Sequence, residues 1–339
     1  MKRILFITNI PSFYKVNQYN ELQKRIDVEA VFIVNTTDER SADFIGKDMR
    51  FKYHEIGGRS LFLQIRYIAS ILRKNNFDKI VYTGWNYLIF YIFALFTAKR
   101  KNGVVIESNY IGSAANGARA FVKRLFLSRI ATAYVSGEAQ RKLAQNLGFA
   151  GDIVKTYGVG VANFVAQAPY REKATVTRFI YVGRLTEVKN LPFLVDYFNH
   201  RPDLSLTLVG MGSLEQDLKS QAKGNVHFAG AIDNKRLPSV YQSHDVFILP
   251  SKSEPWGLVV EEALNNGLPV LVSDKVGCGE EIVCEGENGY IFKHDSLCDL
   301  DVAVRKVTDI DTYNRMAKQI SKTDVEALIE RQISGYLCR

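Results

Sequence analysis

Two segments of the chain combine charged side chains with the backbone geometry that phosphate or sugar ligands need. The first contains Arg184 and Lys189, which follow the apolar run 178–182 and precede a helical pattern. Arginine offers a planar fork of donors to a phosphate, and lysine offers a mobile point charge. Together they suit a diphosphate, although two ordinary solvated cations would give the same local pattern.

The second segment carries two carboxylates, Glu254 and Glu262, on either side of an expected helix start near Gly257 or Leu258. The unpaired amides at the start of a helix form an anion site. One ligand could therefore meet a loop carboxylate, helix amides and a helix carboxylate, which suits a sugar hydroxyl, a diphosphate and a ribose diol. Alternatively, Glu254 is a helix-start charge that the dipole favours and Glu262 is solvated.

Strand-length apolar runs, each followed by a helix-length amphipathic segment, recur along the chain. This alternation predicts a parallel α/β sheet, and it restarts halfway, which predicts two sheets. The first series comprises 4–8, 28–34, 79–82, 104–107, 132–135 and 153–156, and the second 178–182, 204–209, 226–228, 246–249, 270–273 and 290–292. Ligands of such sheets bind beyond the carboxyl ends of the strands, where both charged segments lie.

The segment 157–175 has glycine, proline and little periodicity, which is typical of a linker. We therefore predict an N-terminal domain over 1–168, a C-terminal domain over 169–322, and a C-terminal helix over 323–339 that packs back across the boundary. Neither a GxxxxGK[ST] phosphate loop nor a GxGxxG turn after the first strand occurs, which disfavours a nucleoside triphosphatase or a dehydrogenase.

The composition, with 47% hydrophobic and 24% charged residues, is that of a well-packed globular protein. The first apolar run is too short for a secretion signal, and the longest, 85–98, is shorter than the roughly 20 residues that span a bilayer. These features predict a cytoplasmic protein. Four cysteines without ligand spacing predict free thiols and no metal site.

Positive charge is concentrated in the first half of the chain. Residues 1–165 contain 24 Lys or Arg against 12 Asp or Glu, and the remainder contains 20 against 24. An anionic acceptor, an anionic membrane surface and nucleic acid all fit this asymmetry, but no nucleic-acid-binding motif accompanies it. We expect no nucleic acid partner.

A basic amphipathic helix is expected over 117–130, with Ala118, Phe121, Val122, Leu125 and Phe126 on one stripe. Either this stripe packs on the sheet, with the basic residues facing water, or the helix lies on lipid headgroups.

The order and spacing of several motifs resemble the donor domain of the retaining glycosyltransferases of family 4, which have the GT-B fold. The resemblance covers about residues 177–293. Its motifs are Gly183-Arg184-x4-Lys189-Asn190, Gly210-x-Gly212, Val226-x-Phe228-x-Gly230, Glu254-x2-Gly257-Leu258-x3-Glu262-Ala263 and Glu281-Ile282-Val283-x3-Glu287-Asn288-Gly289.

The resemblance implies two doubly wound Rossmann-like domains that face a central cleft, and retaining transfer from a UDP- or GDP-linked sugar without a metal or other cofactor. By matching position, Arg184 and Lys189 bind the donor diphosphate, Glu254 the sugar and Glu262 the ribose. Further donor contacts are implied for Gly257, Leu258, Gly230 and Ala231. The two Asp-x-Asp patterns, at 299–301 and 309–311, lie outside the motifs and are expected to be surface charges.

The resemblance weakens in the N-terminal half, where the first loop has no glycine pair and no histidine stands at a matching strand end. Glu107 ends the fourth apolar run and is the candidate for contacting the acceptor hydroxyl or the donor sugar. A strand-end polar residue without a role would look the same.

The predicted function is transfer of a sugar to a glycan or lipid-linked glycan acceptor in cell-surface polysaccharide synthesis. The expected location is the cytoplasm, with peripheral attachment to the inner face of the membrane. A sugar-nucleotide-binding protein without transfer activity and a nucleotide-sugar epimerase remain as alternatives.

Overall fold

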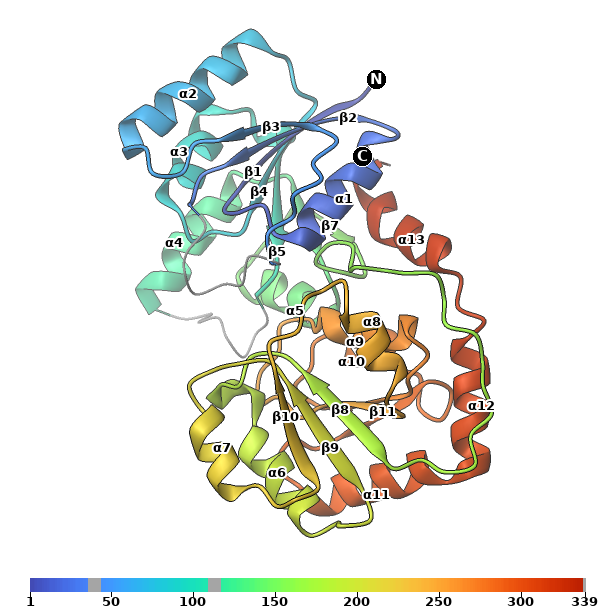
Figure 1. Ribbon diagram of the computed structural model, residues 1–339. Helices are drawn as coiled ribbons and strands as arrows, with labels where there is room; N and C mark the ends of the chain where they lie inside the picture. The colour runs from blue at the N-terminus through green and yellow to red at the C-terminus, as the bar shows by residue number, and fades with distance from the viewer. Residues whose placement is uncertain (36–43, 109–116, 338–339) are drawn as a thin grey trace. The chain divides into compact units, whose positions relative to one another are not determined.

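The computed structural model describes residues 1–35, 44–108 and 117–337, and it divides the chain into two compact units (Figure 1). The first unit is Met1–Val161 together with Glu326–Arg339, and the second is Ala162–Val325. The predicted boundary region falls in the segment that opens the second unit, where 162–177 forms no helix or strand.

The first unit is built on a parallel sheet in the order β3-β2-β1-β4-β5-β6-β7. Buried Val, Ile, Leu and Phe fill most of its central strands, as a sheet covered on both faces requires. The strands are β1 (Arg3–Thr8), β2 (Asp27–Phe32), β3 (Lys52–Glu55), β4 (Lys79–Thr83), β5 (Asn102–Ile106), β6 (Thr132–Val135) and β7 (Asp152–Lys155). The strand order reverses between β1 and β4, so this is where a ligand site is expected.

Strand β3 is the one strand of this sheet that the sequence pattern did not indicate. Its residues, Lys-Tyr-His-Glu, contain no apolar run, and the strand lies at the sheet edge with three of its four side chains exposed. An edge strand needs little hydrophobicity, because only one side pairs and one face is wet.

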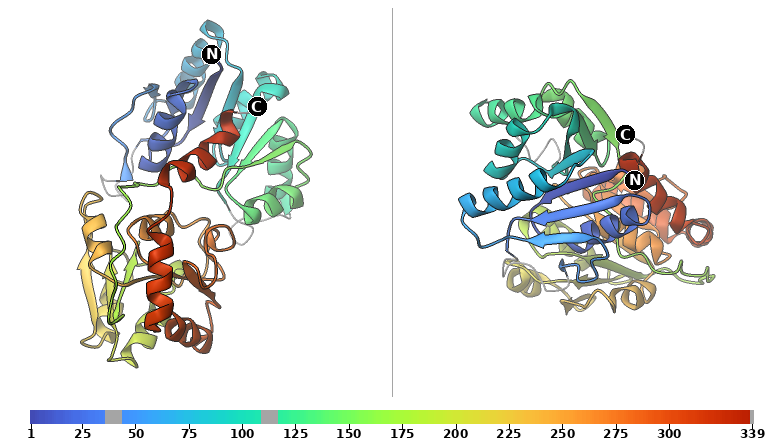
Figure 2. Two further views of the ribbon diagram at one scale, coloured as in Figure 1. Left: turned by 90° about the vertical axis from the view of Figure 1, so that its right-hand side faces the viewer. Right: turned by 90° about the horizontal axis from the view of Figure 1, so that it is seen from above.

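Helices α2 (Leu61–Lys74), α3 (Leu88–Phe96), α4 (Gly117–Ser128) and α5 (Glu138–Asn146) share one core with one face of this sheet. Helices α1 (Phe13–Gln23) and α13 (Val325–Leu337) pack elsewhere in the first unit. Tyr336 of α13 stacks on Tyr134 at 4.3 Å between ring centroids, and Lys2 donates to the Tyr336 carbonyl oxygen. The chain end thus returns to the first unit, as predicted (Figure 2).

The second unit has a parallel sheet in the order β10-β9-β8-β11-β12-β13. The strands are β8 (Arg178–Val182), β9 (Ser205–Val209), β10 (Val226–Gly230), β11 (Val246–Leu249), β12 (Val270–Ser273) and β13 (Gly289–Phe292). The helices are α6 (Leu191–Asn199), α7 (Glu215–Gln221), α8 (Leu237–Gln242), α9 (Leu258–Asn265), α10 (Gly279–Ile282), α11 (Leu297–Thr308) and α12 (Ile310–Ile320). The strand order reverses between β8 and β11. The predicted pair of doubly wound α/β units is confirmed.

None of the helices in the described part of the chain is both long and apolar enough to cross a membrane.

Candidate active site

The loops after β8 and β11 meet where the second sheet reverses its strand order. Arg184 and Lys189 lie in the loop after β8, and Glu254 lies in the loop after β11. The Lys252 N–H donates to the Val188 carbonyl oxygen (2.8 Å), so a direct backbone bond ties the two loops together. The sequence places these residues about 65 positions apart, and the fold brings them to one edge.

The loop that carries Arg184 is held by close backbone contacts. Gly210 has a φ of +131°, and a Cβ there would lie 1.9 Å from the Gly183 carbonyl oxygen, so a side chain is excluded. The buried Tyr181 hydroxyl donates to the Arg184 carbonyl oxygen (2.8 Å). These contacts fix the backbone and leave the guanidinium exposed, without an ion-pair partner among the residues described.

Lys189 and Glu254 form a direct ion pair that is about 85% buried on both sides. This pairing was not predicted, because the sequence motifs implied that Lys189 binds the diphosphate and Glu254 binds the sugar. A burial this deep strengthens the attraction, and it also means that any anion entering beside Lys189 competes with the Glu254 carboxylate.

The backbone around Glu254 holds the start of α9 in place. The Glu254 N–H donates to the Lys275 carbonyl oxygen (3.0 Å), and the Gly277 N–H donates to the Glu254 carbonyl oxygen (2.9 Å). Gly257 has a φ of +105° immediately before α9, so the chain turns sharply and Leu258 opens the helix. The free amides of this first turn lie close in sequence to Glu254, as the motif implied.

Glu262 lies in α9 with 8% of its surface exposed. Burial and, secondarily, the charge of Glu261 raise the pKa of the Glu262 carboxyl to about 7, against the opposing effects of the Asn163 backbone and the Tyr241 hydroxyl. Glu262 is therefore not the solvated helix residue of the simpler interpretation. It titrates near neutral pH, a behaviour that is more frequent at functional sites than on surfaces.

Gly230 and Ala231 lie at the carboxyl end of β10, at the same edge of the sheet. The Gly210 N–H donates to the Gly230 carbonyl oxygen (2.8 Å), which connects this segment to the glycine-lined loop beside Arg184. The second unit thus places five of the predicted donor-binding residues at the end of or after the strands β10, β8 and β11, and the other three at the start of α9 or inside it.

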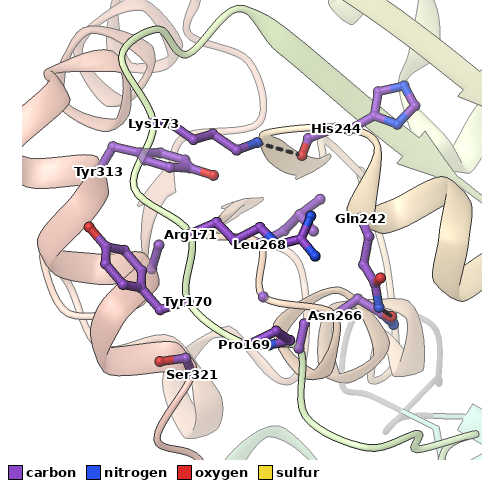
Figure 3. Close-up of a pocket in the computed structure, with 13 residues that line it drawn as sticks. Pro169, Tyr170, Arg171, Lys173, Gln242, His244, Asn266, Leu268, Tyr313 and Ser321 are labelled. Carbon is purple, nitrogen blue, oxygen red and sulfur yellow. Dashed lines mark hydrogen bonds between the residues drawn. The ribbon is translucent and has the colours of Figure 1, made fainter.

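A hollow of about 110 Å³ lies elsewhere in the second unit, beside the amino ends of β8 and β11 (Figure 3). Arg171, Lys173, Gln242 and Tyr313 help to line it, and Lys173 is paired with Asp245. None of the predicted site residues takes part. We place the candidate site at the carboxyl edge, where the exposed Arg184 and the Lys189–Glu254 pair are found.

Glu107 follows β5 in the first unit and contacts a lysine that the sequence analysis missed. Lys15, in the first turn of α1, is only 3% exposed and lies 3.2 Å from the Glu107 carboxylate. Its ammonium also donates to the Asn9 side-chain oxygen (3.0 Å) and to Thr8 (3.4 Å), and Thr83 donates to Thr8 (2.8 Å). These groups form a polar cluster at the strand reversal of the first sheet, between β1 and β4.

Residues 166–323 match the family described as glycosyl transferases group 1. The sulfoquinovosyl transferase SQD2 of Arabidopsis thaliana is 33% identical over 37% of this chain and 25% of its own length. The O-antigen biosynthesis glycosyltransferase WbnH of Escherichia coli is 30% identical over 60% of this chain and 57% of its own. The matched segments thus span about a quarter to three fifths of these relatives.

Solved structures extend the likeness to the whole chain. The galactosyltransferase WaaB of the lipopolysaccharide outer core has a TM-score of 0.73 at 15% identity, with 99% of both chains covered. HepE of Anabaena, solved in complex with UDP, has a TM-score of 0.72 at 17% identity and the same coverage. The chain resembles the GT-B glycosyltransferases.

The GT-B resemblance was predicted from the motifs and is confirmed, whereas membership of family 4 stays a prediction.

Each Asp-x-Asp pattern contains an aspartate that accepts hydrogen bonds from neighbouring protein groups. Asp301 accepts hydrogen bonds from Tyr197 and Arg305, and Asp309 accepts one from the Thr312 N–H at the start of α12. The described residues contain no group of three metal-ligating side chains. Of the cysteines, Cys278, Cys284 and Cys298 are free thiols, and Cys338 lies outside the described residues.

Proposed function

We propose that this protein is a retaining glycosyltransferase that moves a sugar from a UDP- or GDP-linked donor to a glycan or lipid-linked glycan. The observation that carries the proposal is the group of Arg184, Lys189 and Glu254 at the strand reversal of the second sheet, beside the start of α9. Relatives named for O-antigen biosynthesis support a role in cell-surface polysaccharide synthesis. The neighbour solved with UDP supports a nucleotide-linked donor.

Arg184 and Lys189 have the chemistry to stabilise the leaving group. When the bond between the sugar carbon and the phosphate oxygen breaks, the electron pair stays on the diphosphate and the sugar becomes oxocarbenium-like. Fixed cations that face the growing negative charge lower the barrier, because they need no reorganisation. The exposed Arg184 is available to a diphosphate at once, while Lys189 must exchange the Glu254 carboxylate for a phosphate oxygen.

This exchange gives Glu254 its proposed role. Once Lys189 contacts the phosphate, the Glu254 carboxylate is free to accept hydrogen bonds from the hydroxyls of the donor sugar. A negative charge beside the sugar also favours the cationic transition state. The acceptor oxygen attacks on the face that the leaving group vacates, and its proton passes to the departing phosphate oxygen, so the anomeric configuration is retained.

Glu262 is proposed to bind the ribose. An ionised carboxylate accepts hydrogen bonds from both hydroxyls of a diol, whereas the protonated form keeps only part of that capacity. Gly257, Leu258, Gly230 and Ala231 contribute backbone close to the phosphate, sugar and base.

In the first unit, Glu107 is proposed to contact the acceptor hydroxyl, with Lys15 as its positioning residue. The pair holds no net charge, and Thr8 and Thr83 add hydroxyls beside it. Such a cluster suits an uncharged sugar hydroxyl better than a phosphate.

The proposal needs no metal, because Arg184 and Lys189 supply the positive charge. We also propose that the protein works in the cytoplasm at an anionic membrane, where lipid-linked acceptors are found.

The first test is a panel of UDP- and GDP-linked sugars screened by thermal shift. A donor at about 100 times its dissociation constant should add roughly 2.7 kcal/mol to the free energy of unfolding. The stabilising donor is then incubated with glycan acceptors, and the anomeric configuration of the product is read by NMR. Retention is expected. An inverted product contradicts the mechanism, a changed sugar without transfer indicates an epimerase, and binding without either reaction indicates a binding protein.

A further inference from the structure

The outer surface of three helices of the first unit is unusual in both polarity and charge. We call it the α2–α4 face, and it comprises the exposed side chains of α2, α3 and α4 with the basic turn at Lys99–Lys101. The inner residues of the three helices belong to one core against one face of the sheet, so their outer surfaces point to the same side of the unit. Figure 1 shows the helices in succession along that side.

Large apolar side chains project from this face into solvent. The phenyl groups of Phe62, Phe96 and Phe121 are 65%, 85% and 68% exposed. Six aliphatic side chains accompany them, namely Leu61, Leu63, Leu88, Leu95, Val122 and Leu125. Single exposed apolar residues are common, but a set of this size on neighbouring helices marks an interaction surface.

Helix α4 decides between the two interpretations of its apolar stripe. The prediction that the stripe packs on the sheet is wrong for Phe121, Val122 and Leu125, which are exposed. It is confirmed for Phe126, which is buried together with Ala120 and Leu127, and Lys123 covers the Trp85 ring at 5.0 Å. The side chain of Ala118 lies outside the described residues. Ala120 and the two residues almost two turns later form the buried side of α4, so Phe121, Val122 and Leu125 face outward.

The charge of the α2–α4 face has one sign only. The segments 59–76, 85–101 and 117–130 contain eleven Lys or Arg and not one Asp or Glu. The net charge of the whole chain is +8, so these segments account for all of its positive excess. Arg66 lies against the exposed Phe62 ring at 5.7 Å, which shows that cation and phenyl are intermixed on this surface.

We propose that the α2–α4 face docks on an anionic phospholipid bilayer, with the phenyl and aliphatic groups in the acyl boundary and the basic groups on the headgroups. Amphipathic helices with a basic polar side bind membranes in this way. The inference deepens the membrane location given under the proposed function, and its vesicle-binding test does not depend on sugar transfer.

The composition of the face favours lipid over other partners. A second copy would bring one strongly basic surface against another, which is repulsive. Single-stranded nucleic acid needs stacking side chains beside its cations, but six of the nine exposed apolar residues are aliphatic and have no ring to stack. A bilayer accepts both rings and aliphatic chains while its headgroups neutralise the cations.

The test is co-sedimentation with vesicles of phosphatidylcholine alone or with about one third phosphatidylglycerol, at roughly 0.1 M and 1 M salt, where the Debye length is about 10 Å and 3 Å. Two triple variants are compared with wild type. One is Phe62→Gln/Phe96→Gln/Phe121→Gln, and the other is Arg73→Gln/Lys74→Gln/Arg124→Gln. The matched control is Leu297→Gln/Val302→Gln, which changes exposed apolar residues of α11 in the second unit.

Wild type and control should bind the anionic vesicles at low salt and retain weaker binding at high salt. Each basic residue removed should weaken partitioning about fivefold at low salt, so the charge variant should lose about a hundredfold. The phenyl variant should lose the binding that survives at high salt. Its thermal shift with UDP or GDP should equal that of wild type, which separates loss of docking from loss of the donor site.

Equal binding to both vesicle types, no binding at all, or unchanged binding by the phenyl variant would overturn the proposal. Sedimentation velocity without lipid tests whether a second copy of the chain occupies the face. A dimer that the phenyl variant converts to a monomer would make the face a protein interface instead.

Discussion

The two sheets reverse their strand order at comparable points, but the polar groups gathered there differ. In the second unit, Arg184 is exposed and free of ion pairs with the described residues, and the Lys189–Glu254 pair is about 15% exposed. In the first unit, Lys15 is 3% exposed and is held by Glu107, Asn9 and Thr8. The same fold thus yields one site with surplus positive charge and one that is internally neutralised. The site of the second unit suits a diphosphate, and the site of the first unit suits a neutral hydroxyl.

The largest effects should come from removing the surplus charge of the second unit. Arg184→Ala and Lys189→Ala should each lower turnover about 100- to 1000-fold, as loss of one preorganised donor to a developing charge does. Steady-state kinetics with the identified donor measure this. Lys235→Ala, an exposed lysine of the same unit, should keep wild-type turnover. Near-normal turnover in either site variant, with folding intact, would remove the diphosphate assignment.

The neutralised cluster of the first unit is tested by Lys15→Met. The change leaves Glu107 without its cation, and a hydrogen bond to a charged group contributes about 1.5–3 kcal/mol. We expect kcat/KM for the acceptor to fall about 10- to 100-fold, while the Kd of the donor stays unchanged.

If Lys15 had a purely structural role, Lys15→Met would impair acceptor kcat/KM and donor binding alike. In a Glu107→Gln background the same substitution should cost much less, because the partner charge is already gone. An equal cost in both backgrounds would show that the two residues do not act together.

A pH titration tests the role of Glu262 in the second unit without a substitution. Glu262 has a pKa raised to about 7, so lowering the pH from about 8 to about 6 takes it from mostly ionised to mostly protonated. If only the carboxylate binds the ribose fully, donor affinity should fall about tenfold over this range. Calorimetry with an intact nucleotide sugar, whose diphosphate has no proton to gain near neutral pH, measures it. Glu262→Gln should bind weakly at every pH, and an unchanged pH slope in this variant would assign the titration to another group.

The smallest expected effect on turnover is that of removing metal ions. Since Arg184 and Lys189 provide the positive charge at the diphosphate, turnover should be unchanged after treatment with a chelator. A full loss that a divalent cation restores would contradict the metal-free mechanism.

The sequence predicted the second unit better than the first, for physical reasons. The donor motifs combine glycines and charged residues at fixed spacing in the loops that follow strands, and a ligand site is the simplest reason for that combination. The direct contact between Lys189 and Glu254 depends on the order of β8 and β11, which no local pattern contains. Lys15 was missed because one lysine in an early helical turn gives no sign of burial. Strand β3 was missed because its residues are polar, and the outward turn of Phe121 depends on packing around Ala120.

The central claim is that Lys189 leaves Glu254 to bind the donor diphosphate, which frees Glu254 for the sugar. Glu254→Gln tests it most directly, with calorimetric binding of the free nucleoside diphosphate and turnover measured on the same protein. The amide holds Lys189 less strongly than the carboxylate does, so the nucleotide should bind as tightly as in wild type or more tightly. Turnover should fall at least 100-fold, because a preorganised charge beside the sugar is lost. Weaker nucleotide binding with normal turnover would contradict the claim.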